Sequence, residues 1–198
     1  MTDSGVGNKF SGGSIVGKGD ATTIFDVTGS YNTIGGITVT GSDSTKIKIR
    51  ILGDHNTFTG VTVTGSSTSD IVIDIVGSYN VFKGLVMTAS NGAQITVTLD
   101  SDKNTITGGV ITASDQSTAT WFLFNGNAFS GCKLTTSKSA HGLVNATGSL
   151  NALTGMTVTA SGTSDFKFNL PKNSAADSGR TVTITAGSTE VTVPTISA

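Results

Sequence analysis

Residues 56–66 read Asn-Thr-Phe-Thr-Gly-Val-Thr-Val-Thr-Gly-Ser, and variants of this stretch recur along most of the chain. Within it, Val61 and Val63 alternate with Thr62 and Thr64. Alternation with a period of two is typical of a β-strand that buries one face and exposes the other. The stretch therefore predicts a short strand that follows an asparagine and a glycine.

The recurrence has a fixed spacing of 24 residues, with one step of 23. Each copy begins at an asparagine, in order Asn8, Asn32, Asn56, Asn80, Asn104, Asn127 and Asn151. A glycine follows four residues later, at Gly12, Gly36, Gly60, Gly84, Gly108, Gly131 and Gly155. A fixed period of about 20 to 50 residues is the mark of a stacked architecture in which each repeat contacts only its neighbours.

A second strand pattern follows within each period, and its apolar residues also return one period later. These residues are Ile47, Ile49 and Ile51, then Ile71, Ile73 and Ile75, then Ile95, Val97 and Leu99. Helical periodicity is absent. We therefore predict an all-β fold, a single-stranded right-handed parallel β-helix with about seven or eight rungs spaced by about 4.8 Å.

The repeat divides the 198 residues into an N-terminal arm (1–7), the β-helix (8–187) and a C-terminal strand or tail (188–198). We expect the asparagine side chains to form a hydrogen-bonded ladder that caps turn backbone groups. The glycine column is expected to mark a bend with positive φ or a close backbone approach. Neither column requires a catalytic role to explain it.

The composition gives no electrostatic reason to expect a nucleic-acid partner. Only 13% of the residues are charged and the net charge is −1, so nothing favours nucleic acid. Lys46, Lys48 and Arg50 lie one period before Asp70 and Asp74, which predicts ion pairs between rungs. The single cysteine, Cys132, excludes an internal disulfide and falls on an apolar column, as a buried inert thiol does.

The start of the chain lacks a basic and apolar leader, and no stretch approaches the ~20 apolar residues of a membrane span. The expected place of synthesis is a cytoplasm, without membrane insertion.

The asparagine ladder, the apolar stacks and the Asn-x-aromatic-x-Gly corners resemble those of the right-handed β-helices of the pectin-lyase-like superfamily. That superfamily includes polysaccharide lyases, glycoside hydrolases and the trimeric tailspikes and appendages of bacteriophages. The resemblance covers nearly the whole chain and is architectural, so it implies the fold more strongly than any activity.

A search for the chemistry of those enzymes finds no catalytic constellation, metal-ligand spacing or cofactor motif. Glu190 is the only glutamate and lies outside the repeat. Asp26 and Asp74 flank Arg50, and a second pair, Asp54 and Asp102, flanks Ser78 at a corner. Alternating charge explains the first pair and turn formation the second, with glycan contact at Asp54 and Asp102 as an alternative.

Two histidines complete the search for catalytic groups. His55 and His141 lie far apart in the repeat, with no serine or carboxylate at the spacing of a catalytic triad.

Outward threonines offer a different interpretation. The pairs Thr38 and Thr40, Thr62 and Thr64, and Thr157 and Thr159 resemble the Thr-x-Thr arrays of ice-binding β-solenoids. Val86, Val110 and Lys133 interrupt the array, and an outward β-branched residue is ordinary on a strand.

The 23-residue rung contains Trp121-Phe-Leu-Phe-Asn-Gly. Alignment forward from Asn104 directs Trp121 and Leu123 inward and Phe122 and Phe124 outward, whereas alignment backward from Asn127 reverses them. Either register exposes bulky apolar residues, which mark a subunit interface or a sugar-stacking platform. The candidate interface is Trp121, Phe122, Phe124 and Leu143.

Three function hypotheses remain. The first is a non-enzymatic virion component, a homotrimeric bacteriophage decoration, fibre or spike protein that contacts other virion proteins and host surface glycan. The second is a polysaccharide-binding or depolymerising tailspike domain, and the third is an ice-binding or adhesive solenoid.

Overall fold

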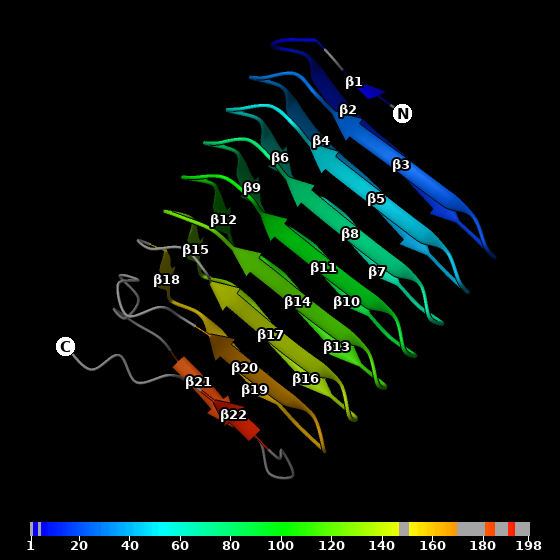
Figure 1. Ribbon diagram of the computed structural model, residues 1–198, viewed down its shortest axis with the longest axis vertical. Coiled ribbons are helices and arrows are strands. Elements are labelled where there is room, and N and C mark those ends of the chain that lie inside the picture. Colours follow the sequence, from blue (N-terminus) through cyan, green and yellow to red (C-terminus); the bar gives the residue numbers. More distant parts are fainter. Residues whose placement is uncertain (1, 4, 147–150, 170–180, 185–189, 193–198) are drawn as a thin grey trace.

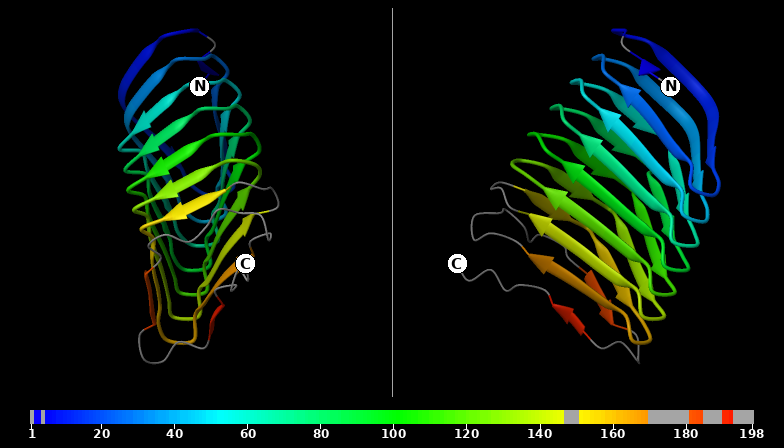
Figure 2. Two further views of the ribbon diagram at one scale, coloured as in Figure 1. Left: turned by 90° about the vertical axis from the view of Figure 1, so that its left-hand side faces the viewer. Right: turned by 45° about the vertical axis from the view of Figure 1, so that its right-hand side comes forward.

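The computed structural model describes residues 2–3, 5–146, 151–169, 181–184 and 190–192, and in this part of the chain it is all-β. The chain winds around one axis as a parallel β-solenoid, so strands 24 residues apart lie side by side (Figure 1). Most rungs contain three strands, because the period holds three extended segments separated by turns. The side views show these rungs as successive loops of one coil (Figure 2).

One nine-stranded parallel sheet contains one strand from each rung, most of them of five or six residues, and is here called the long sheet. Its strands, in spatial order, are β1 (Thr2–Asp3), β3 (Thr22–Val27), β5 (Lys46–Ile51), β8 (Asp70–Ile75), β11 (Gln94–Leu99), β14 (Thr118–Leu123), β17 (His141–Ala146), β20 (Asp165–Asn169) and β22 (Glu190–Thr192). Thr2 and Asp3 pair with Asp26 and Val27, so this part of the expected N-terminal arm joins the sheet.

The other strands form two parallel ladders that meet in β2 (Lys9–Gly17) and β4 (Thr33–Gly41). The short ladder continues through β6 (Thr57–Thr59), β9 (Val81–Lys83), β12 (Thr105–Thr107), β15 (Ala128–Ser130) and β18 (Ala152–Thr154). The middle ladder continues through β7 (Thr62–Gly65), β10 (Val86–Ala89), β13 (Val110–Ser114), β16 (Lys133–Ser137), β19 (Thr157–Ala160) and β21 (Thr181–Ile184).

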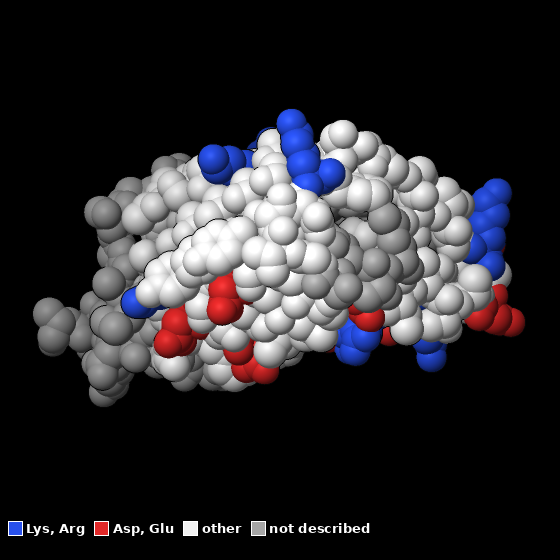
Figure 3. Space-filling view, turned by 90° about the horizontal axis from the view of Figure 1, so that it is seen from above, with Lys and Arg blue, Asp and Glu red and all other residues white. Residues whose placement is uncertain are grey.

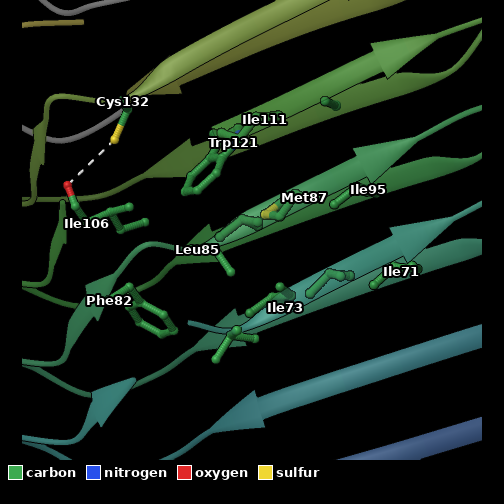
Figure 4. Packing of buried hydrophobic residues seen from close by; sticks show 14 of the residues in the cluster. Ile71, Ile73, Phe82, Leu85, Met87, Ile95, Ile106, Ile111, Trp121 and Cys132 are labelled. Atoms are coloured by element: carbon green, nitrogen blue, oxygen red, sulfur yellow. Dashed lines mark hydrogen bonds between the residues drawn. The ribbon is translucent and has the colours of Figure 1, made fainter. Parts of the chain in front are cut away.

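The core fills the space between these three faces. The inward residues of the middle ladder and the long sheet are buried as predicted, among them Ile37, Val63, Met87, Ile73 and Leu99. Like side chains lie over like side chains, and the rings of Phe58 and Phe82 stack with centroids 4.6 Å apart. Figure 4 shows how these columns of apolar side chains face one another across the core.

The described chain makes about six turns, slightly fewer than the seven or eight rungs predicted. The asparagines from Asn8 to Asn151 bound these turns, whereas the prediction of seven or eight rungs also counted residues 170–180, which lie outside the described residues.

Candidate functional site

The asparagine column lies at the corner between the long sheet and the short ladder, here called the Asn corner. The backbone N–H of Asn56 donates to Oδ1 of Asn80 at 2.8 Å, and Nδ2 of Asn80 donates to the carbonyl oxygen of Gly53 at 2.9 Å. Asn32 and Asn56 make the same pair of bonds. Each of these side chains therefore joins its own rung to the preceding one at two points.

Glycine at the Asn corner has a steric cause. A Cβ on Gly53 or Gly77 would lie 2.0 or 2.2 Å from the carbonyl oxygen of the glycine one rung before. The predicted glycine column four residues after each asparagine is explained by backbone conformation and not by close packing. Gly60 and Gly84 have φ of +61° and +64°, and a Cβ added at either would meet open space.

A row of exposed rings, which was not predicted from the sequence, runs along the same corner. Tyr31 stacks on His55 and His55 on Tyr79, each pair with ring centroids 4.8 Å apart. Nζ of Lys103 donates a 2.7 Å hydrogen bond to Tyr79 Oη, and this bond raises the pKa of Lys103. The missed signal was a ring in the position immediately before three consecutive asparagines.

All four residues of this row have φ between 59° and 61°, a region that bulky side chains rarely adopt. The left-handed conformation costs roughly 1–2 kcal/mol per residue, and aromatic pairs contribute about 0.5–1.5 kcal/mol each, so the two stacked pairs offset only part of the strain. Because the ring faces cover one another, the row offers mainly ring edges to solvent. It is a poor platform for stacking a sugar.

The candidate glycan contacts Asp54 and Asp102 both lie exposed at the Asn corner. Oδ1 of Asp54 accepts the backbone N–H of Ser78 at 2.7 Å, and the N–H of Asp54 donates to Ser30 Oγ at 3.0 Å. The carboxylate of Asp54 thus caps the next turn of its own solenoid, which is the turn-forming role.

The charged column of the long sheet forms the predicted ion pairs between rungs. Arg50 makes a two-pronged contact with Asp26, with Nε donating to Oδ1 at 2.7 Å and Nη2 to Oδ2. The bond from Arg50 lowers the pKa of Asp26. Lys48 pairs with Asp74 at 2.7 Å. Figure 3 shows how such charges stand in small groups on an otherwise uncharged surface.

The 23-residue rung follows the forward register. Trp121 and Leu123 are buried, with Trp121 only 1% exposed and its ring packed edge-on against Phe129. Phe124 still continues the ladder, because its N–H donates to the carbonyl oxygen of Leu99. The missing residue is therefore absorbed in the turn between Phe124 and Asn127, where Gly126 lies beside Lys103.

This register corrects the candidate interface. Trp121 is a core residue and leaves the set, because the pleat directs it inward. Phe122 and Leu143 point outward and are half-buried, and Phe124 is 37% exposed at the Asn corner. Among the described residues, the buried side-chain atoms without a hydrogen-bond partner include Nδ2 of Asn127 and Nε1 of Trp121.

Cys132 lies in the core on the apolar column. Its Sγ lies 3.7 Å from the carbonyl oxygen of Ile106, the contact drawn in Figure 4. Burial raises the pKa of the thiol, so it remains protonated and unreactive.

Outward threonines form an unbroken column on the middle ladder, paired in register as Thr40, Thr64, Thr88, Thr112, Thr135 and Thr159. The neighbouring column contains Val86, Val110 and Lys133 between its threonines. The exposed ammonium of Lys133 interrupts the flat uncharged face that ice binding requires.

One histidine has a carboxylate partner that was not predicted from the sequence. Nδ1 of His141 lies 2.8 Å from Oδ1 of Asp165, one rung further along the long sheet. Among the described residues no hydroxyl or thiol bonds to the other ring nitrogen, so the pair lacks the nucleophile of a triad. The described residues also contain no group of three or more histidine, cysteine or acidic side chains suited to a metal ion. They contain no helix long and apolar enough to cross a membrane.

No protein-family model matches the chain, and no curated protein or solved structure matches it either. The structure itself defines the class, a parallel β-solenoid. The finer resemblance to the pectin-lyase-like superfamily remains a proposal.

Proposed function

We propose that this chain is a non-enzymatic structural component of a larger assembly. On the resemblance to the pectin-lyase-like superfamily, we propose more narrowly a homotrimeric decoration, fibre or spike protein of a bacteriophage particle, made in the host cytoplasm and in contact with other virion proteins. In support, the residues that recur in the repeat serve packing, capping and turn formation.

One observation carries the proposal, a pair of outward apolar side chains on neighbouring strands of the long sheet. The outward side chains of β3, β5 and β8 include the Asp26–Arg50 and Lys48–Asp74 pairs. In β14 the position equivalent to Asp74 is Phe122, and Leu143 lies on the adjacent strand β17. An outward apolar pair in place of charges is the composition of an interface centre.

The area sets how far such an interface extends. Three neighbouring six-residue strands of the long sheet present an outer face of roughly 300 Å² at the usual rise and spacing of strands. Stable interfaces bury about 800 Å² per partner. The contact therefore includes neighbouring rungs or the Asn corner, with Phe122, Leu143 and Phe124 near its centre.

Native mass spectrometry of the wild type and of the double variant Phe122→Ser/Phe124→Ser tests this. The wild type is expected to be a trimer. The variant is expected to remain a monomer even at a protein concentration about 100-fold above the one at which half of the wild-type trimer dissociates, because central aromatic residues contribute most to binding. The control Val86→Ser/Val110→Ser makes the same change on the middle ladder and keeps the trimer. A monomeric wild type at micromolar concentration, or loss of the trimer in both double variants, refutes the proposed interface.

A further inference from the structure

The two ends of the solenoid have open strand edges in the same ladder. At one end, β2 pairs with β4, and no described strand lies on its other side. At the opposite end, β21 pairs with β19 and is the last strand of the middle ladder within the described part of the chain. Figure 1 shows β2 at one end of the coil and β21 and β22 at the other. Open edges of this kind can pair with the backbone of another chain.

Backbone donors of β2 point out of its end of the coil. In later rungs, Thr33 and Val86 donate their N–H groups to the rung before, at 2.8 and 2.9 Å. Lys9 and Ser14 hold the equivalent positions in the first rung, so their N–H groups face the end. β2 contains no proline that would blunt this edge.

The apolar core also reaches the surface at this end. Phe10 and Ile15 are half-buried, whereas Ile34 and Val39, which lie over them one rung on, are at most 1% exposed. A hollow of about 60 Å³ opens beside Phe10 and Ile15, where Gly13 adds no side chain to the core. A further rung placed on this end would therefore bury apolar surface as well as pair the backbone.

The two ends match in the middle ladder. Followed rung by rung, Thr181–Ile184 of β21 lies on the same columns as residues 14–17 of β2. Val182 takes the register position of Ile15, in a column that is apolar in every rung. A β21 strand from a second copy, placed before β2, would continue the ladder in parallel and in register.

The two ends also match in the long sheet. Glu190–Thr192 of β22 lies on the columns of residues 22–24, whereas Thr2–Asp3 of β1 lies on the columns of Asp26 and Val27. Because these columns differ, β22 of one copy and β1 of the next can lie end to end in one shared rung. The same shared rung places β21 directly beside β2, so one arrangement satisfies both ladders.

We infer that copies of this chain join head to tail, with the β21 and β22 end of one copy seated on the β1 and β2 end of the next. The joint uses the ends of the coil, whereas the lateral contact proposed above uses an outer face. Each added copy leaves another open end, so the product is a filament. Seven full strands of the long sheet and one shared strand per copy give an axial repeat of about 38 Å.

Small-angle X-ray scattering of the full wild-type chain, up to millimolar concentration, tests the joint. The particles should lengthen with concentration at constant cross-section, by about 38 Å for each added copy. Particles of constant length overturn the inference. Growth that stops at two copies also overturns it, because a head-to-head pair would make the facing strands antiparallel and end the assembly.

An edge variant separates the joint from folding. Ser14→Pro removes an N–H that faces the end, and proline is tolerated on a sheet edge, so the variant should fold and stay at the length of one copy. Its β21 end remains intact, so each filament can include one variant chain, and an equimolar mixture with the wild type should limit the mean length to about two copies. Ser14→Ala keeps the N–H and should form filaments as the wild type does.

Two results with the variant contradict the joint. Ser14→Pro that lengthens as the wild type does, or that leaves wild-type filaments equally long after mixing, refutes pairing at β2. The readout is particle length, whereas a lateral trimer changes particle thickness, so failure here leaves the proposed interface standing.

Discussion

Replacing Asn80 and Asn127 by alanine makes the same change in the same column with different expected costs. Oδ1 of Asn80 accepts from the N–H of Asn56, and its Nδ2 donates to Gly53 O, at 2.8 and 2.9 Å. Alanine leaves both buried partners unsatisfied. Each such group costs about 1–3 kcal/mol, so Asn80→Ala should destabilise the fold by roughly 2–6 kcal/mol.

Asn127 differs because only one end of its side-chain amide is hydrogen-bonded. Its Oδ1 accepts from the N–H of Asn104 at 2.9 Å, but its Nδ2 has no partner among the described residues. Asn127→Ala removes one satisfied bond and one unsatisfied donor, two terms of about 1–3 kcal/mol with opposite sign. The expected net cost is about 1 kcal/mol or less.

Urea unfolding followed by far-ultraviolet circular dichroism measures both changes, with the slopes checked for equality so that midpoints report free energies. The expected result is a lower midpoint for Asn80→Ala and a nearly unchanged midpoint for Asn127→Ala. Costs that agree within about 0.5 kcal/mol would refute the reasoning, because the bond from Nδ2 to the preceding rung would then contribute nothing to stability.

Three further changes test other columns. Gly77→Ala places a Cβ 2.2 Å from Gly53 O and should lower the melting temperature far more than Gly84→Ala, which faces open space at φ +64° and should cost about 1–2 kcal/mol; the reverse order contradicts the steric account. Asp26→Asn should destabilise the protein at neutral pH. Arg50 lowers the pKa of Asp26 in the folded state, so the ion pair stabilises the fold at pH values above the unfolded pKa of about 3.9, and this stabilisation is lost as the pH falls through the folded pKa. The urea midpoints of the variant and the wild type should therefore converge in acid. A difference between the midpoints that stays constant with pH counts against the pairing. Cys132 should react with a disulfide reagent at pH 8 only in denaturant, and rapid labelling of the native protein would show that it is not buried.

The sequence was sufficient for the core of the fold. Period-two alternation at Val61 and Val63, repeated at a spacing of 24, specifies parallel strands in register, and the inward columns are buried as predicted. The position of the missing residue was not predictable, because both registers of Trp121-Phe-Leu-Phe alternate equally well. The turn before Asn127 absorbs it, which leaves Trp121 in the core against Phe129.

The surface features were harder to predict because they depend on turn conformation. Asn91-Gly92 is a recognisable type I′ signal, but Asp115-Gln116 and Lys138-Ser139 adopt the same turn without any such signal. Stacking of Tyr31, His55 and Tyr79 likewise requires a left-handed backbone that their residue types disfavour. In both cases the surrounding rungs impose the conformation.

The side chains of Asn32, Asn56 and Asn80 each make two hydrogen bonds to the rung already completed. The first residue of a new rung therefore finishes the previous one, as Asn80 does for Asn56 and Gly53. A ribosome releases the chain in the same order, so each loop can close as soon as its successor begins to emerge. The same direction gives a rule for shortening or lengthening the solenoid by recombination. A chain that ends just after an asparagine keeps the last loop capped. A chain that ends just before that asparagine leaves the buried backbone N–H of the asparagine one rung earlier without its acceptor.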